Sequence, residues 1–203
     1  GADNVALGYR ALNANTTASN NTAVGKDALN ANTTGHGNIG IGTSALAANT
    51  TGISNVAVGY LAADAQAGNA NYNVAIGAEA LSTNTLGSQN VAIGRSALIA
   101  FNVTSAAATY NTAVGDQAGK SVTTGIQNTL IGGLAGDAIV DAQLAIVVGY
   151  NSDTNATGEG NQIVIGNNIT GAGANNVKLG TSGGTATLGL DGSDTSWAAA
   201  SDE

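Results

Sequence analysis

The chain of 203 residues contains no cysteine, proline or methionine, and aromatic residues make up only 3% of it. The absence of cysteine excludes disulfide bonds and thiolate chemistry. So few large side chains would leave an ordinary globular core poorly filled. Charged residues are also scarce, at 9%, and the formal net charge of −8 disfavours binding to nucleic acid phosphates or anionic membrane surfaces.

Long hydrophobic runs are missing as well. No apolar stretch approaches the length of a membrane span, and no signal peptide opens the chain. We therefore expect no membrane insertion. The net negative charge leads us to expect no nucleic acid partner either. Because Gly1 begins almost inside a repeat, the sequence has the appearance of an excerpt from a longer protein.

What the chain does have is a recurring phrase of the form Asn-x-Ala-x-Gly. The glycines that close successive copies are mostly 17 residues apart, and a fixed period in this range predicts a solenoid. With the asparagine as position 1, positions 2 and 4 hold β-branched or aliphatic residues, which a strand places on one face. The other face carries only Asn, Ala (or Gly) and Gly, so a second backbone can approach it closely, inside the coil or on a neighbouring chain.

The rest of the repeat predicts how each coil closes. Glycine at position 5 suits a turn with a positive φ. Charges at positions 6 and 7 mark an exposed corner, and Ala-Leu pairs such as Ala28-Leu29 bring the chain back inward. Asn-Thr-Thr-Gly, as in residues 32–35, then predicts a second extended segment and a second turn. We therefore expect an all-β parallel solenoid, or β-roll, of about eleven coils, each with two short strands.

The asparagine at position 1 recurs in almost every coil. Stacked asparagines can form hydrogen bonds along a solenoid and satisfy buried turn amides and carbonyls. We interpret these residues as a structural ladder, which consists of Asn4, Asn21, Asn38, Asn55, Asn73, Asn90, Asn111 and Asn128.

Two insertions and a change of character divide the chain. Regular repeats span residues 1–115, divergent repeats span 116–182, and a C-terminal tail spans 183–203. The larger insertion, in residues 99–110, contains the only phenylalanine. Since insertions in a solenoid form loops on one face, often the binding face, this segment is a candidate contact patch.

Tyrosine rings on a hydrophilic rod could stack on sugars, or lie over the small residues of the next coil. The candidate ligand contacts are Phe101, Tyr110, Tyr72, Tyr60 and Tyr9.

The chemistry of known catalytic or metal sites is not evident. His36 is the only histidine, which excludes a Ser-His-Asp triad or a histidine metal cluster within one chain. The acids Glu79 and Asp116 occupy exposed corners two coils apart, which does not suit glycoside hydrolysis. We expect no enzymatic activity, no metal and no cofactor. An ice-binding face remains an alternative, but the adjacent Thr33 and Thr34 would point to opposite faces of a strand.

The phrase Asn-x-Ala-Val/Ile-Gly resembles the head repeats of YadA-like trimeric autotransporter adhesins, over about residues 4 to 180. That family implies a left-handed parallel β-roll in which three chains lie side by side. Those heads use a shorter coil, so the 17-residue period and its Asn-Thr-Thr-Gly segment depart from the family pattern.

The C-terminal tail carries a second resemblance. Trp197 followed by Ser201, Asp202 and Glu203 is similar to the junction before the self-cleaving intramolecular chaperone of phage tail fibres and tailspikes. The resemblance implies a cleavage junction at Ser201 and Asp202. The chain stops before the Arg-Leu-Lys that follows in that family.

Together these features predict a homotrimeric segment of a bacteriophage tail fibre, located in the virion tail. Its expected partners are further copies of itself and a host-surface polysaccharide or protein receptor. The alternatives are a bacterial surface adhesin head with the same coil and an ice-binding solenoid. A polysaccharide-degrading tailspike is disfavoured by the scarcity of glutamate, of which the chain has three.

Overall fold

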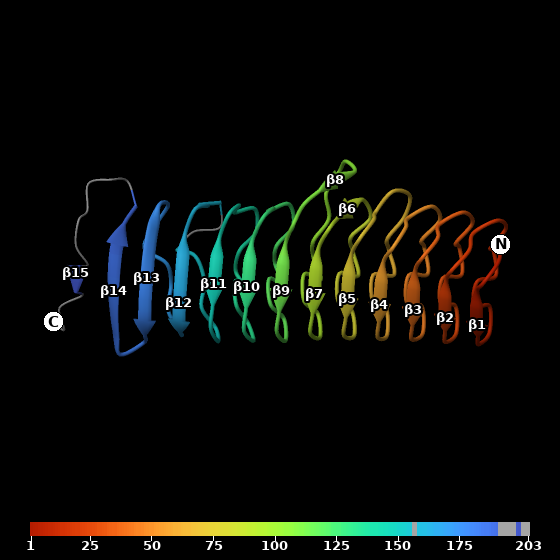
Figure 1. The fold of residues 1–203 in the computed structure, drawn as a ribbon. Helices are drawn as coiled ribbons and strands as arrows, with labels where there is room; N and C mark the ends of the chain where they lie inside the picture. Colours follow the sequence, from red (N-terminus) through yellow and green to blue (C-terminus); the bar gives the residue numbers. More distant parts are fainter. Residues whose placement is uncertain (156–157, 191–197, 200–203) are drawn as a thin grey trace.

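The computed structural model describes residues 1–155, 158–190 and 198–199. These residues form an all-β parallel solenoid of ten coils, and they contain no helix. The strands of the large sheet lie side by side in one row, with β1 (Val5–Leu7) at one end of the rod and β15 (Ala198–Ala199) at the other (Figure 1). Coils 1 to 10 begin at Asn4, Asn21, Asn38, Asn55, Asn73, Asn90, Asn111, Asn128, Ala145 and Gln162.

One sheet of thirteen strands runs the length of the rod, and a second sheet contains two strands. The large sheet contains, in order, β1 (Val5–Leu7), β2 (Thr22–Val24), β3 (Ile39–Ile41), β4 (Val56–Val58), β5 (Val74–Ile76), β7 (Val91–Ile93), β9 (Thr112–Val114), β10 (Thr129–Ile131), β11 (Ile146–Val148), β12 (Ile163–Asn167), β13 (Asn176–Thr181), β14 (Gly184–Gly189) and β15 (Ala198–Ala199). The small sheet pairs β6 (Gly87–Ser88) with β8 (Ala107–Ala108).

In the large sheet, the strands from β1 to β13 pair in parallel, each with the strand of the next coil at the same repeat position. The expected eleventh coil does not close. Its strand β13 turns back into β14 as an antiparallel hairpin, which ends the parallel stacking.

The small side chains of each strand lie inside the coil. Ala23, Gly40 and Ala57, at position 3 of coils 2 to 4, are buried, whereas the residues on either side of them are partly or fully exposed. The Ala28-Leu29 pair is fully buried, as predicted. A Cβ on Gly40 would lie 3.2 Å from Cγ of Leu29. The leucine therefore fills the space that the small strand residue leaves.

The glycine at position 5 has no room for a side chain. In coils 1 to 9 its φ lies between 128° and 142°. A Cβ on Gly94, for example, would lie 2.2 Å from the carbonyl oxygen of Gly115 in the next coil. The repeat needs glycine here both for the backbone conformation and for the close stacking of successive turns.

The prediction of a second strand in each coil is wrong for most coils. Residues 32–37 form bends and irregular backbone instead of a strand, and among the described residues only β6 and β8 pair as strands outside the large sheet. The reason is local. The side chain of Asn32 donates a hydrogen bond to the carbonyl oxygen of Gly35, at 2.9 Å, and this contact curls the backbone.

The asparagines at position 1 connect each coil to the next. The backbone N–H of Asn38 donates to Oδ1 of Asn21 at 2.9 Å, and Nδ2 of Asn21 donates to the carbonyl oxygen of Gly35 at 2.9 Å. The N–H-to-Oδ1 contact repeats between successive coils from Asn4 to Asn128, and the last one joins Ala145 to Asn128. Each side chain thus satisfies groups that the solenoid buries.

Candidate interaction surfaces

The largest regular surface is the outer face of the long sheet, defined here as positions 2 and 4 of coils 1 to 10. Because position 3 points inward, positions 2 and 4 must point outward. Every residue in these two columns is Val, Ile, Leu or Thr. The most exposed large members are Val5, Leu7, Ile39, Ile41, Ile76, Ile131, Ile146 and Ile165, at 37% to 67% exposure.

The structure thus places the bare Asn-Ala-Gly face inside the coil and leaves the bulky face outside. In β13 and β14 the same columns continue through Val177 and Leu188, which pair with each other and follow Ile163. With strands about 4.8 Å apart and two residues per strand, the outer face covers on the order of 500 Å². This is as large as the largest apolar patch on a typical monomer.

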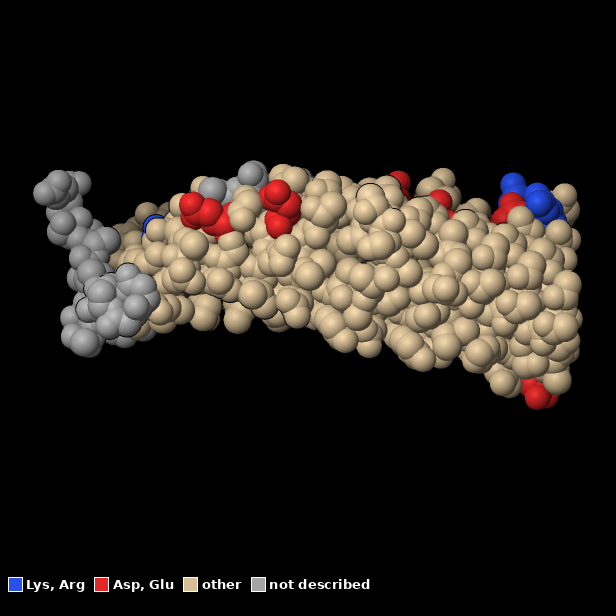
Figure 2. Space-filling view, turned by 90° about the horizontal axis from the view of Figure 1, so that it is seen from above, with Lys and Arg blue, Asp and Glu red and all other residues tan. Residues whose placement is uncertain are grey.

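Charges gather elsewhere on the rod. Figure 2 views the side on which β6 and β8 lie, and it shows a broad uncharged surface with acidic and basic groups mainly along one long edge. Among the described residues, three ion pairs each join a coil to the next. They are Arg10–Asp27 at 3.5 Å, Arg95–Asp116 at 2.8 Å and Lys120–Asp137 at 2.7 Å.

The tyrosines expected as ligand contacts all lie at the surface. Tyr9, Tyr60, Tyr72 and Tyr110 are 52% to 69% exposed. They follow or precede the outer-face strands, at the turn after position 5 or just before position 1. The ring of Tyr150 lies over Gly133 of the preceding coil, where an added Cβ would come 3.5 Å from Cδ2.

Phe101 requires a correction, because its side chain is fully buried and cannot contact a ligand at the surface. It packs at the level of β6, where a Cβ on Gly87 would come 2.8 Å from its ring. The inserted loop that follows it, residues 102–108, is the part that projects from the rod (Figure 1). Six of these seven residues are exposed, so the loop remains a candidate contact segment without its phenylalanine.

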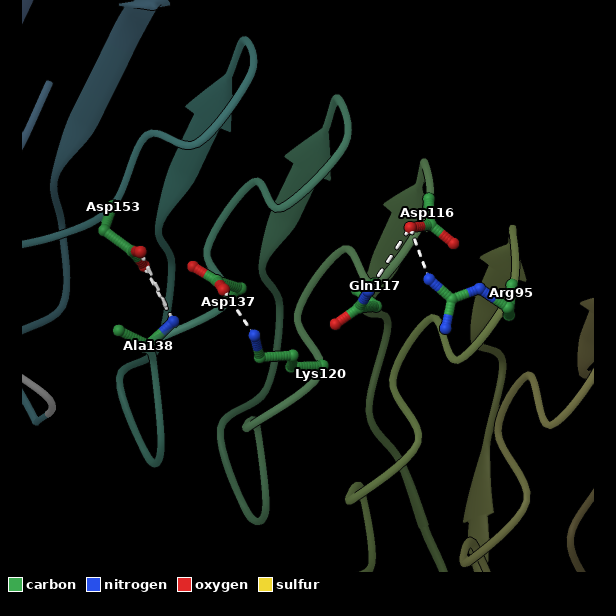
Figure 3. Close-up of polar contacts among 7 residues, drawn as sticks. All are labelled: Arg95, Asp116, Gln117, Lys120, Asp137, Ala138 and Asp153. Atoms are coloured by element: carbon green, nitrogen blue, oxygen red, sulfur yellow. Dashed lines mark hydrogen bonds and ion pairs between the residues drawn. The ribbon is translucent and has the colours of Figure 1, made fainter. Parts of the chain in front are cut away.

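A chain of charged side chains crosses coils 7 to 9 (Figure 3). Lys120 Nζ lies 2.7 Å from Asp137 Oδ2, and Asp153 stands in the next coil. The backbone N–H of Ala138 donates to both carboxylate oxygens of Asp153, at 3.2 and 3.3 Å.

Asp153 has the most perturbed carboxyl among the described residues. Burial, and after it the neighbouring carboxyl of Asp137, raise its pKa to about 7. The N–H of Ala138 and the charge of Lys120 oppose it more weakly. Asp64, in coil 4, has a pKa raised chiefly by burial and opposed by backbone N–H groups.

The sequence contained a signal for Asp153 that was missed. Asp153 occupies position 9 of its coil, which is the buried leucine position in coils 2, 3, 5 and 6. Asp153 itself is half-buried, but a carboxyl at a position that other coils bury, beside an acid of the preceding coil, is a recognisable anomaly.

The other predicted site residues lie apart from Lys120, Asp137 and Asp153. His36 is exposed in its turn. Ser201 and Asp202, the expected cleavage junction, lie outside the described residues. Within the described residues, no three histidine, cysteine, aspartate or glutamate side chains are grouped so that they could hold a metal ion. That part of the chain also has no helix long and apolar enough to cross a membrane.

In comparisons with known proteins, no family model, no curated protein and no solved structure matches the chain.

Proposed function

We propose that this chain is a shaft segment of a bacteriophage tail fibre that assembles as a homotrimer and attaches to a host cell-surface glycan. The observation that carries the proposal is the outer face, an uncharged strip of aliphatic side chains, interrupted by three threonines, that follows coils 1 to 10. Such a strip is costly to leave in water, since apolar area contributes about 25 cal/mol per Å² when it is buried. Packing the same strip from three parallel rods buries it along the entire length.

Two further features support a fibre. The solenoid stacks coils through a repeated ladder, so its length scales with the number of coils, and ten coils give a rod of about 50 Å. The resemblance of the repeats and of the C-terminal tail to fibre-forming families points the same way. Exposed tyrosines and the loop of residues 102–108 are the side chains proposed to meet a glycan. A bacterial adhesin head with the same coil is the main rival.

The solution mass, measured by light scattering, tests the assembly. We expect a mass about three times the 19.5 kDa of one chain. Ile76→Lys together with Ile131→Lys places two charges on the outer face, so it should convert the trimer into monomers that keep their β-rich circular dichroism. His36→Lys adds a charge at an exposed turn and serves as the matched control, which should remain trimeric.

A folded wild-type monomer would overturn the trimeric fibre. It would instead favour the ice-binding alternative, because the outer face repeats regularly, with rows about 4.8 Å apart and alternate residues about 6.7 Å apart. Thermal hysteresis would then be measured on that monomer. Binding to a glycan array, with Tyr72→Ala and Tyr110→Ala as the variants, tests attachment separately from assembly.

A further inference from the structure

We propose that the last residues of coils 4 to 9 form a row of alternating apolar and amide side chains that binds a neutral, linear polysaccharide laid along the rod. This inference rests on the proposed attachment to a glycan, and it names the chemical class of that glycan and the residues that contact it. In chain order the alternating row consists of Tyr72, Gln89, Tyr110, Gln127, Leu144 and Asn161.

The members of the alternating row are in register because each directly precedes position 1 of the next coil. The asparagines at position 1, from Asn73 to Asn128, are stacked by N–H-to-Oδ1 contacts of 2.9 to 3.1 Å. Successive coils lie about 4.8 Å apart, so the backbones at Tyr72 and Tyr110, two coils apart, are separated by about 9.6 Å. Gln89 stands between them in the intervening coil.

Tyrosine is an unusual residue at this position, because the backbone there is left-handed in each of coils 1 to 9. The φ angle is 57° at Tyr72 and 53° at Tyr110, a conformation that asparagine tolerates and that costs free energy for a bulky residue. Leu29 also has a positive φ, but its side chain is fully buried and packing compensates for the strain. The two tyrosine rings remain 53% and 52% exposed, so a bound ligand is the contact that would compensate for theirs.

The two kinds of side chain match the two kinds of surface that a sugar presents. A tyrosine ring can stack on the C–H face of the sugar, and a side-chain amide can donate to one hydroxyl while it accepts from another. Gln89 and Gln127 are exposed, and within the described residues their amides make no hydrogen bond. The last three residues of coils 4 to 8 contain no Asp, Glu, Lys or Arg, which suits a neutral glycan.

The spacing of the rings favours a polysaccharide over a peptide. An extended peptide presents equivalent side chains about 6.7 Å apart, which does not match rings about 9.6 Å apart. A polyproline II peptide repeats about every 9.3 Å, but its prolines have no N–H to donate to the amide oxygens between the rings. In an extended linear glycan one sugar can lie over each coil, so every second sugar meets an apolar side chain and the sugar between meets an amide.

Binding of the full chain to an array of neutral and acidic bacterial polysaccharides, and to oligosaccharides prepared from those that bind, tests the alternating row. We expect neutral linear glycans to bind, with an affinity that rises about tenfold from the disaccharide to the trisaccharide, which reaches both rings. Tyr72→Asn and Tyr110→Asn should each lower the affinity for the longer oligosaccharides about tenfold. They should also raise the thermal midpoint by about 2–4 °C, because asparagine relieves the backbone strain.

Asn20→Tyr is the matched control, because Asn20 has the same repeat position and a φ of 60° but lies outside the alternating row. It should lower the thermal midpoint by a similar amount and leave glycan binding unchanged. If neither tyrosine variant folds, Gln89→Ala decides, since loss of its amide should weaken binding about threefold to tenfold and unchanged binding would contradict the alternating row.

Glycan binding that is the same in the wild-type chain and in both tyrosine variants would overturn the alternating row and leave the proposed attachment standing. Binding to no glycan on the array would overturn both. Binding to acidic glycans alone, or tighter binding to a proline-rich peptide than to any glycan, would also overturn the alternating row. A smaller solution mass for either tyrosine variant would assign the rings to the contact between chains instead.

Discussion

Coils 2 and 3 and coil 8 fill the same narrow interior with different side chains. In coils 2 and 3 the strand contributes a small residue at position 3 and the return segment contributes a leucine at position 9, such as Leu46. In coil 8 the large and the small residue exchange positions. Leu130 stands at position 3 and Gly136 at position 9, and a Cβ on Gly136 would lie 2.6 Å from Cδ2 of Leu130.

Position 12 shows the same contrast. Coils 2, 3 and 5 bury asparagine there, and Asn49 donates to Asn32 at 2.8 Å in a second ladder inside the rod. Coils 6 to 8 bury Phe101, Val122 and Ile139 at the same place. The fold therefore constrains the volume inside each coil and the pairing of its polar groups, and it leaves open which residues supply them.

The largest effect should come from substitutions at Leu130 and Gly136, the two residues that exchange size in coil 8. Leu130→Ala removes the side chain that fills the coil and should destabilise the chain by about 3–5 kcal/mol. Gly136→Leu adds a second side chain to a filled space and should cost about 3 kcal/mol. The double variant Leu130→Ala with Gly136→Leu recreates the arrangement of coil 2, which has Ala23 and Leu29, so it should recover at least about 2 kcal/mol of the summed loss.

Urea denaturation of the four chains measures this coupling. The comparison is fair because leucine at position 9 already adopts a positive φ elsewhere, with 50° at Leu29 and 53° at Leu46. Gly136 has a φ of 63°, so Leu there adds no new backbone conformation. If the loss of stability in the double variant equals the sum of the two single losses, a side chain at one position does not compensate for its absence at the other.

The next largest effect concerns the ladder at position 1, which coils 1 to 8 have and coil 9 lacks. Asn55 accepts from the N–H of Asn73 at 2.9 Å and donates to the carbonyl oxygen of Ala70 at 2.8 Å. Asn55→Ala leaves both groups buried and unpaired, and should cost about 2–4 kcal/mol. Thermal unfolding followed by circular dichroism measures it, with the exposed Asn13→Ala as the control expected within about 0.5 kcal/mol.

Much of the fold could be predicted because the rules involved are local. Alternation placed strands at positions 2 to 4, positive φ required glycine at position 5, and the Ala-Leu pair turned inward. The choice between the two faces of the strand was left open, since both satisfy alternation. Only the return path of the coil decides it, when Leu29 packs against Gly40.

The site was harder to predict because it depends on contacts between coils. Phe101 suggested a surface contact, yet it takes the position that asparagine holds in coils 2, 3 and 5 and is therefore a core residue. Asp153 gained its meaning only when position 9 was known to be buried and Asp137 was seen to lie beside it. Numbering every coil from position 1 would have shown both anomalies.

The smallest effect should come from a substitution that makes position 12 of coil 4 apolar, as it is in coils 6 to 8. Gln66 is fully buried there, and neither its Nε2 nor its Oε1 has a hydrogen bond partner among the described residues. Gln66→Leu keeps the volume and removes two unpaired polar atoms, so it should stabilise the chain by about 1–2 kcal/mol. Asn84→Leu is the matched contrast, because Asn84 both accepts from and donates to the backbone of Gly87, at 2.9 and 2.8 Å, and its loss should destabilise. Opposite signs for the two variants in urea denaturation would show that pairing, and not polarity as such, decides which residues this interior accepts; a loss of stability in both would contradict it.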